Sequence, residues 1–199
     1  VTMTAATFST AISRAPTEER ERQAISMAAD KCLAAGITGI HDAGVSPAQI
    51  ERYKSLIDSG DLGIRIYAML GNPGYDNRED YAAYISDNLI DSYADQRLAV
   101  KSIKLFMDGA LGSRGAAMYD DYSDRPGHTG LLTLTYDDAL MVSRAALDAG
   151  AQVCTHAIGD KGNRLILDAY EKALAENPAP DHRFRVEHAQ VVSLDDIPR

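Results

Sequence analysis

The chain has 199 residues, of which 45% are hydrophobic and 25% charged, the composition of an ordinary soluble globular protein. Its 29 acidic and 20 basic residues give a net charge of −9, which argues against nucleic-acid binding because phosphate backbones are bound by basic surfaces. No apolar run reaches the roughly 20 residues of a membrane-spanning helix, so we expect no membrane partner.

The N-terminus and the cysteines indicate the compartment. The segment VTMTAATFSTAISRAPTEERE lacks the charged start, long apolar region and cleavage site of a signal peptide, so secretion is not indicated. Cys32 and Cys154 lie in apolar surroundings far apart in the sequence, and we expect both to be buried free thiols. A cytoplasmic location, where thiols stay reduced, fits this expectation.

Helix and strand signals alternate along the chain. After an irregular lead-in at residues 1–15, Thr17 caps the first helix and Gly36 follows its end, whereas Ser46 caps the second helix with Pro47 at its first position. In chain order, the predicted elements are a helix at 17–35, a strand at 36–44, a helix at 46–60, a strand at 64–70, a helix at 78–94, a strand at 98–109, a loop at 110–130, a helix at 135–150, a strand at 151–157, a helix at 160–177 and a strand at 183–189.

This alternation predicts an α/β fold with a parallel sheet and crossover helices. A doubly wound sheet and a barrel both fit it, but the first strand–helix turn lacks the G-x-G-x-x-G of a nucleotide-binding sheet. Polar residues at or just past the strand ends favour a barrel. In a parallel barrel these ends converge on one mouth, whereas an open sheet would spread them along an edge. These residues are His41, Asp42, Asp108, His156 and His188.

Two consecutive predicted strands end in a histidine, in the runs THAIGD and VEHAQ. A lone histidine at a strand end is more often a hydrogen-bonded structural residue than a ligand. His156 and His188 would lie within a few ångströms of each other on parallel neighbours, and imidazole is the commonest metal ligand. The pair is therefore half of a candidate metal site.

Lys104 lies in the middle of the longest predicted strand. By alternation it shares a face with Val100, Ser102, Phe106 and Asp108, and this face points toward the barrel axis. Burying an ammonium there costs several kcal/mol unless it is paired or neutral. The sequence leaves three explanations open, namely a salt bridge to an acid such as Asp108, a Schiff-base lysine of depressed pKa, and a carbamate that binds metal.

Four runs together resemble the amidohydrolase superfamily, and within it amidohydrolase family 3, the branch of N-substituted formamide deformylases and many uncharacterised metal-dependent hydrolases. The runs are GITGIHDAG, KLFMDGALGSRGAAMYDDYSDRPGHTGLL, THAIGDKGNRLILDAYEKA and RVEHAQ. The resemblance covers the chain from about residue 16 to its end. It implies a TIM-type (β/α)₈ barrel with one or two divalent metals, usually zinc, held by a carboxylated lysine on strand 4 and by the histidines that close strands 5 and 6. Lys104, His156 and His188 match these three ligands.

The chain departs from the family pattern in two places. It has no H-x-H pair for strand 1 and no strand-8 aspartate. On this mapping, residues 1–199 are the central segment of one hydrolase barrel domain, with strands 2–6 and their helices but without strands 1, 7 and 8. We expect such a chain to be inactive alone. Three alternatives are open for it, namely weak metal binding, homo-oligomers formed through its open sheet edges, and a place within a larger enzyme.

The resemblance implies hydrolysis of a carbon–nitrogen bond in a small amide, formamide or cyclic amide by a metal-activated water. An aldolase-like barrel with Lys104 as a Schiff base is the alternative enzyme. A non-catalytic barrel scaffold is the third interpretation.

Several other residues are secondary candidates. Arg114, in the loop after strand 4, could contact a substrate carboxylate or carbonyl, and Asp108 could contact substrate or hold Lys104 or its carbamate. Asp160 is predicted to cap the helix that follows His156. With His188 facing the axis, Glu187 would face the apolar helix layer together with its neighbour Arg185. A local bulge and a pair between these two residues are both left open as explanations.

Histidines outside the predicted pair are given minor roles. His41 and Asp42 are expected to support the site or simply to form hydrogen bonds, and His128 and His182 are expected to be solvent residues.

Overall fold

A curved sheet is the central feature of the computed structural model, which describes residues 17–74 and 80–199. The predicted lead-in at residues 1–15 lies outside the described residues. The strands are β1 (Gly39–Val45), β2 (Arg65–Gly71), β3 (Ile90–Tyr93), β4 (Leu98–Phe106), β5 (Gln152–Ala157) and β6 (Arg185–His188). The helices are α2 (Glu18–Ala34), α3 (Pro47–Asp58), α4 (Tyr81–Asn88), α5 (Tyr136–Ala149) and α6 (Asp160–Glu176).

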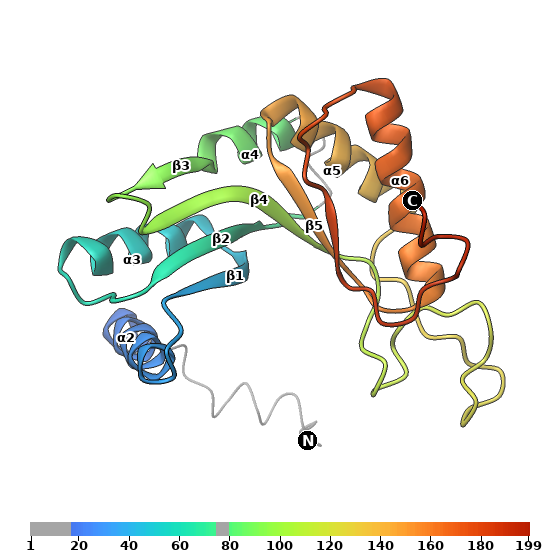
Figure 1. The fold of residues 1–199 in the computed structure, drawn as a ribbon, viewed down its shortest axis with the longest axis horizontal. Coiled ribbons are helices and arrows are strands. Elements are labelled where there is room, and N and C mark those ends of the chain that lie inside the picture. The colour runs from blue at the N-terminus through green and yellow to red at the C-terminus, as the bar shows by residue number, and fades with distance from the viewer. Residues whose placement is uncertain (1–16, 75–79) are drawn as a thin grey trace, which may run out of the picture.

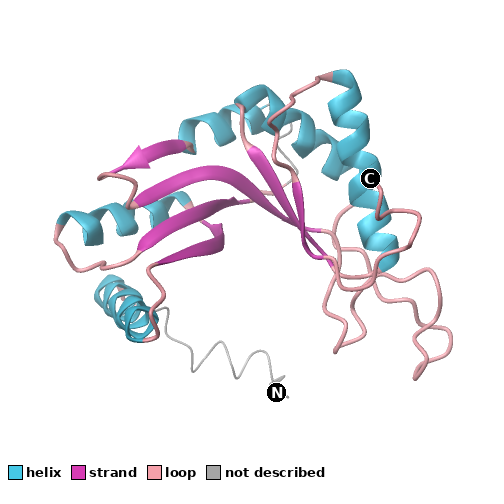
Figure 2. Cartoon of the chain, viewed as in Figure 1, coloured by secondary structure: helices cyan, strands magenta, loops and turns pink. Residues whose placement is uncertain are grey.

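Five of the strands are parallel neighbours in the order β1-β2-β4-β5-β6, and the short β3 runs antiparallel to β4. Figure 1 shows this sheet as an open arc with α3, α4, α5 and α6 around its outside. The arc confirms the predicted α/β class and the partial TIM-type barrel, whose strands 2–6 correspond to β1, β2, β4, β5 and β6. Figure 2 shows the long irregular connection that joins β4 to α5.

The helix starts follow local capping chemistry. The side chains of Thr17, Ser46 and Thr135 each accept a backbone N–H from the first turn of α2, α3 and α5, as the sequence predicts. Helix α6 differs, because Gly159 is its N-cap and no side chain at that position accepts a hydrogen bond. Asp160 is instead the first helical residue.

The prediction of one helix over residues 78–94 is wrong in its second half. Helix α4 ends at Asn88, and Ile90–Tyr93 forms β3. Ile90 pairs with Val100 and Tyr93 with Leu98, at the edge of β4 that β5 leaves uncovered. Pairing with that edge overrides the helical pattern of the sequence.

Strand β4 also departs from simple alternation. Ala68 and Met69 of β2 pair with Val100 and Ser102, so Lys101 is an extra residue in a bulge. Val100 consequently packs in the core cluster that β1, β2, α2 and α3 share, and the prediction that Val100 faces the barrel axis is wrong.

Beyond the bulge, the predicted alternation of β4 holds. Ile103, Leu105 and Met107 are fully buried in a second core cluster with α5 and α6. Lys104 therefore lies on the opposite, concave face of the sheet.

Both cysteines are free thiols. Cys154 is buried, and burial raises the pKa of its thiol, whereas Cys32 is only half-buried. Within the described ranges, no helix combines the length and the apolar character that crossing a membrane requires.

Candidate metal centre

The carboxyl ends of β4, β5 and β6 bring the predicted site residues to one region of the concave face. Lys104 pairs with Cys154, Phe106 pairs with His156, and His156 pairs with Glu187 in the parallel register. Residues at the same level of neighbouring parallel strands point to the same face. The register therefore places the amine, the imidazole and the carboxylate on one side of the sheet.

His156 and His188 lie in contact, with their ring centroids 4.6 Å apart and their planes at 73°. The register pairs His188 with Ala157, which is buried in the core on the helix side. Regular alternation would send the His188 side chain to that side as well. The backbone of His188 has φ +78°, and this left-handed conformation ends the strand and turns the ring toward His156.

Lys104 is only 4% exposed, and its Nζ donates to the carbonyl of Leu105 at 2.6 Å. Burial lowers the pKa of the amine to about 8, against an opposing effect of Glu187. The Nζ lies 3.7 Å from the ring centroid of Phe106, which is 5.7 Å from that of His156. The distance from Nζ of Lys104 to the ring centroid of His156 is therefore at most the sum of these two distances.

A cavity of about 320 Å³ opens beside Lys104. Its lining comes from the ends of β1, β2 and β4 and from the loop before α5: Gly44, Gly71, Asn72, Lys104, Leu105, Phe106 and Thr133. Sequence reasoning did not single out Asn72, Phe106 or Thr133 as lining residues. For Phe106 a signal existed, because it follows Lys104 by two residues on the same strand face.

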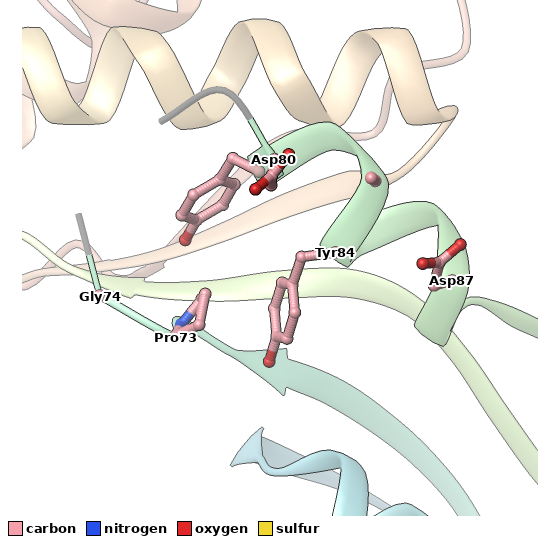
Figure 3. Close-up of a pocket in the computed structure, with 7 residues that line it drawn as sticks. Pro73, Gly74, Asp80, Tyr84 and Asp87 are labelled. Carbon is pink, nitrogen blue, oxygen red and sulfur yellow. The ribbon is translucent and has the colours of Figure 1, made fainter. Parts of the chain in front are cut away.

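Two tyrosines of α4 form hydrogen bonds to residues that line this cavity. The hydroxyl of Tyr81 donates to Oδ1 of Asn72 at 2.7 Å, and that of Tyr84 donates to the carbonyl of Gly71 at 2.9 Å. Figure 3 shows Tyr84 at a neighbouring cavity of about 490 Å³ between α4 and the chain that leaves β2. The Lys104 cavity therefore has a rim fixed by side-chain hydrogen bonds.

Asp108 is buried and does not form the ion pair with Lys104 that the sequence left open, both residues being in the described part of the chain. Its Oδ1 accepts the N–H of Ile158 at 2.9 Å, and its Oδ2 accepts those of Ala117 at 3.0 Å and Gly159 at 2.8 Å. The carboxylate thus joins the end of β4 to the following loop and to the start of α6.

The side chain of Arg114 contacts Asp124 and not the histidine pair. Its guanidinium binds the Asp124 carboxylate through both oxygens, with a shortest distance of 2.7 Å, and this pair raises the pKa of Arg114. The backbone of Arg114 has φ +57°, and its carbonyl accepts a hydrogen bond from Nε2 of His128 at 2.8 Å. The structure therefore shows Arg114 as part of the internal bracing of the loop.

Arg185 and Glu187 face the concave side of the sheet, not the helix layer. Nε of Arg185 donates to Oε1 of Glu187 at 2.8 Å, while Phe184 and Val186 pack against the core. Of the two explanations left open by the sequence, the pair is the one that forms. Strand β6 keeps an unbroken register with β5 from Arg185 to His188, and the backbone irregularity is the positive φ of His188. Glu187 thereby becomes a neighbour of the candidate site.

The other predicted histidines and acids have local roles. His41 stacks on Tyr67 with centroids 4.7 Å apart, and Asp42 accepts a hydrogen bond from the Tyr53 hydroxyl. Burial and this bond raise the pKa of Tyr53. His182 accepts the N–H of Phe184 at Nδ1.

The chemistry of the donor set fits a divalent ion in part. Burial lowers the pKa of His156, which keeps its imidazole in the neutral form that binds metals. Across residues 17–74 and 80–199, no three His, Cys, Asp or Glu side chains come together as metal ligands. Two imidazoles and one buried amine are what these residues provide, and the amine would need to become a carbamate to act as a ligand.

Comparisons with known proteins agree with this fold. The sequence profile of the amidohydrolase family matches residues 2–199. The crystal structure of an uncharacterised metal-dependent hydrolase from Pyrococcus furiosus superposes with a TM-score of 0.76 at 28% identity, covering 95% of this chain and 37% of that one.

Two curated relatives share parts of the sequence. Protein LONG AFTER FAR-RED 3 of Arabidopsis thaliana is 43% identical over half of this chain and 17% of its own length. The putative amidohydrolase YtcJ of Bacillus subtilis is 27% identical over 89% of this chain and 32% of its own length. The chain thus spans about a third or less of these two relatives, and across its own length it belongs to the amidohydrolase family.

Proposed function

We propose that this chain carries the central part of the active site of a metal-dependent hydrolase that cleaves a carbon–nitrogen bond other than a peptide bond. The substrate class is a small amide, formamide or cyclic amide. Family membership and the likeness to metal-dependent hydrolases support the reaction class. The single observation that carries the proposal is the grouping of Lys104, His156 and His188 at one end of three neighbouring strands.

His156 and His188 would hold the ion as neutral imidazoles, and Lys104 would hold it as a carbamate. A bound divalent ion, zinc in our proposal, lowers the pKa of a bound water to about 7 and polarises the scissile carbonyl. With a pKa of about 8, the Lys104 amine is partly neutral near neutral pH. The neutral nitrogen can attack the carbon of CO₂ and release one proton, which leaves an anionic carbamate.

The contacts of Phe106, Arg114 and Asp108 limit how each residue could bind the substrate. Phe106, exposed by 52%, forms one wall of the cavity beside Lys104 and offers an apolar surface to the substrate. Nε and Nη2 of Arg114 are bound to Asp124, so a substrate contact would use Nη1 or require this pair to open. The predicted substrate contact of Asp108 would compete with the three backbone N–H groups that it already binds.

The proposal also covers the activity of the isolated chain, its location and its oligomeric state. Lys104, His156 and His188 match three of the six ligand side chains of the family pattern, so we propose that residues 1–199 alone are not catalytically competent. We also propose a cytoplasmic location, supported by the free thiols, and homo-oligomers formed through the open edges of β1 and β6.

Metal analysis and amide-hydrolysis assays of a full-length protein that contains residues 1–199 test the proposal. We expect a divalent ion that chelators remove, together with loss of this ion and of amide hydrolysis in Lys104→Ala and His156→Ala. Lys101→Ala is the matched control, since Lys101 lies on the same strand and is paired with Asp91 at the surface. Absence of any bound divalent ion, with activity unchanged in Lys104→Ala, would contradict the proposal.

The lowered pKa of Lys104 also favours a second candidate, Schiff-base chemistry with a carbonyl substrate. Borohydride reduction in the presence of aldehydes or ketones would then leave a covalent adduct on the Lys104 peptide. The hydrolase proposal expects no such adduct.

A further inference from the structure

Asp108 contacts both the start of α6 and the ring of His156. Its side chain has no solvent exposure, and its carboxylate accepts three backbone N–H groups from the loop at Ala117 and from the turn that precedes α6. Hydrogen bonds to both oxygens fix the orientation of the Asp108 carboxyl group. The same carboxylate also borders the ring of His156, one of the candidate ligands.

Nε2 of His156 lies 3.4 Å from Oδ1 of Asp108 and 3.4 Å from the carbonyl oxygen of Gly109. A carbonyl oxygen can only accept hydrogen bonds, and Nε2 bonds to the carbonyl of Gly109. Nε2 must therefore carry a hydrogen. In a neutral imidazole this leaves Nδ1 without one, with its lone pair free.

We propose that Asp108, with the Gly109 carbonyl, is a positioning residue that holds His156 in the tautomer protonated at Nε2. Nδ1 is then the nitrogen that binds the divalent ion. Only this second step rests on the proposed function. Carboxylates and carbonyls that fix the tautomer of a ligand histidine commonly change metal affinity by about 10- to 100-fold when they are lost.

The sequence around the turn is built to keep the Asp108 carboxylate in place. A Cβ added at Gly162 would lie 2.7 Å from Oδ2 of Asp108, and one added at Gly159 would lie 1.9 Å from the carbonyl oxygen of Ala117. That carbonyl accepts the N–H groups of Lys161 and Gly162 in the first turn of α6. The run HAIGDKG is thus explained by a helix start that closes directly onto Asp108 and its loop.

Asp108→Asn is the decisive variant. Oδ2 accepts two N–H groups and Oδ1 only one, so the amide oxygen of Asn should take the place of Oδ2. The amide NH₂ would then face Nε2 of His156 and donate to it, while the N–H of Ile158 loses its acceptor. We expect the ring hydrogen of His156 to move to Nδ1 in the metal-free variant.

The measurement is the ¹⁵N chemical shift of the His156 ring nitrogens in metal-free protein labelled at histidine, assigned with His156→Gln. The expected result is a hydrogen on Nε2 in the wild-type protein and on Nδ1 in Asp108→Asn, with Co²⁺ affinity lowered about 10- to 100-fold. Asp160→Asn is the control, because Asp160 also accepts backbone N–H groups at the start of α6, from Tyr119 and Lys161. We expect His156 to keep its wild-type tautomer in Asp160→Asn.

A hydrogen on Nδ1 of His156 in the wild-type protein would overturn the inference, and this result needs no folded variant. The same tautomer in the wild-type protein and in folded Asp108→Asn would overturn it as well. If Asp108→Asn does not fold, Gly162→Ala displaces the carboxylate without removing its charge and should weaken the preference for Nε2–H. A full-length wild-type protein that binds no Co²⁺ refutes the proposed function, while the tautomer still decides the role of Asp108.

Discussion

His156 and His188 face each other across the β5–β6 boundary although the sheet register sets them one residue out of step. The contact depends on the left-handed backbone of His188, which turns its ring away from the helix side where its partner Ala157 is buried. A candidate ligand pair is thus created by one local departure from strand geometry.

The first prediction concerns the backbone at His188. Asparagine tolerates the left-handed region and a β-branched residue does not, so we expect His188→Val to be less stable than His188→Asn by about 1–2 kcal/mol. Urea unfolding of the metal-free variants measures the difference. His188→Gly, which has no steric penalty at φ +78°, is the control and should match or exceed His188→Asn. Equal stability of the Val and Asn variants would show that the left-handed backbone is absent.

Much of the fold follows from local sequence signals. Caps at Thr17, Ser46 and Thr135 and the alternation of helices and strands are short-range features, and they predicted five parallel strands in the right order. The positions of Lys104 and His156 on one face also follow from the period of a strand, because in the register Lys104 pairs with Cys154, two residues before His156.

What the sequence could not predict depends on pairing across the chain or on backbone handedness. The bulge at Lys101 moves Val100 to the helix side, and only the register with β2 reveals it. Strand β3 exists because the edge of β4 is free there. The turn of His188 and the contact of Arg114 with Asp124 both involve positive φ angles, which no hydrophobic period reports.

The second prediction concerns the pH dependence of stability. Burial lowers the pKa of Lys104 from 10.5 to about 8, so between these values the unfolded chain holds a proton that the folded protein has released. The free energy of unfolding should therefore rise with pH from about 8 to 10.5, by at most about 3 kcal/mol. Denaturant titrations of metal-free wild-type protein and Lys104→Met check this. Parallel curves for the two proteins would contradict the prediction.

The third prediction separates two roles of Arg114. If the guanidinium leaves Asp124 to bind substrate, Arg114→Ala should raise KM at least tenfold, whereas Asp124→Ala should leave KM within about twofold because it frees the same group. If the pair only braces the loop, the two variants should behave alike and both should speed proteolysis within residues 110–130. Steady-state kinetics of a full-length protein that contains residues 1–199, with limited proteolysis of the same preparations, distinguish these outcomes.

The fourth prediction concerns Tyr170, whose hydroxyl lies 2.6 Å from Oγ1 of Thr155 in β5 and 3.2 Å from the carbonyl of Arg185 in β6. This buried hydroxyl ties together the two strands that carry the histidine pair. Tyr170→Phe leaves Oγ1 of Thr155 without this partner and should cost about 1–3 kcal/mol, since an unsatisfied buried polar group loses its full hydration.

The isosteric Thr155→Val removes the other side of the same contact. The double variant Tyr170→Phe with Thr155→Val should therefore cost about 1 kcal/mol less than the two single changes added together. Chemical denaturation of the four proteins measures this coupling. Strict additivity would mean that the two hydroxyls do not bond, and that backbone pairing and apolar packing hold β5 beside β6 without them.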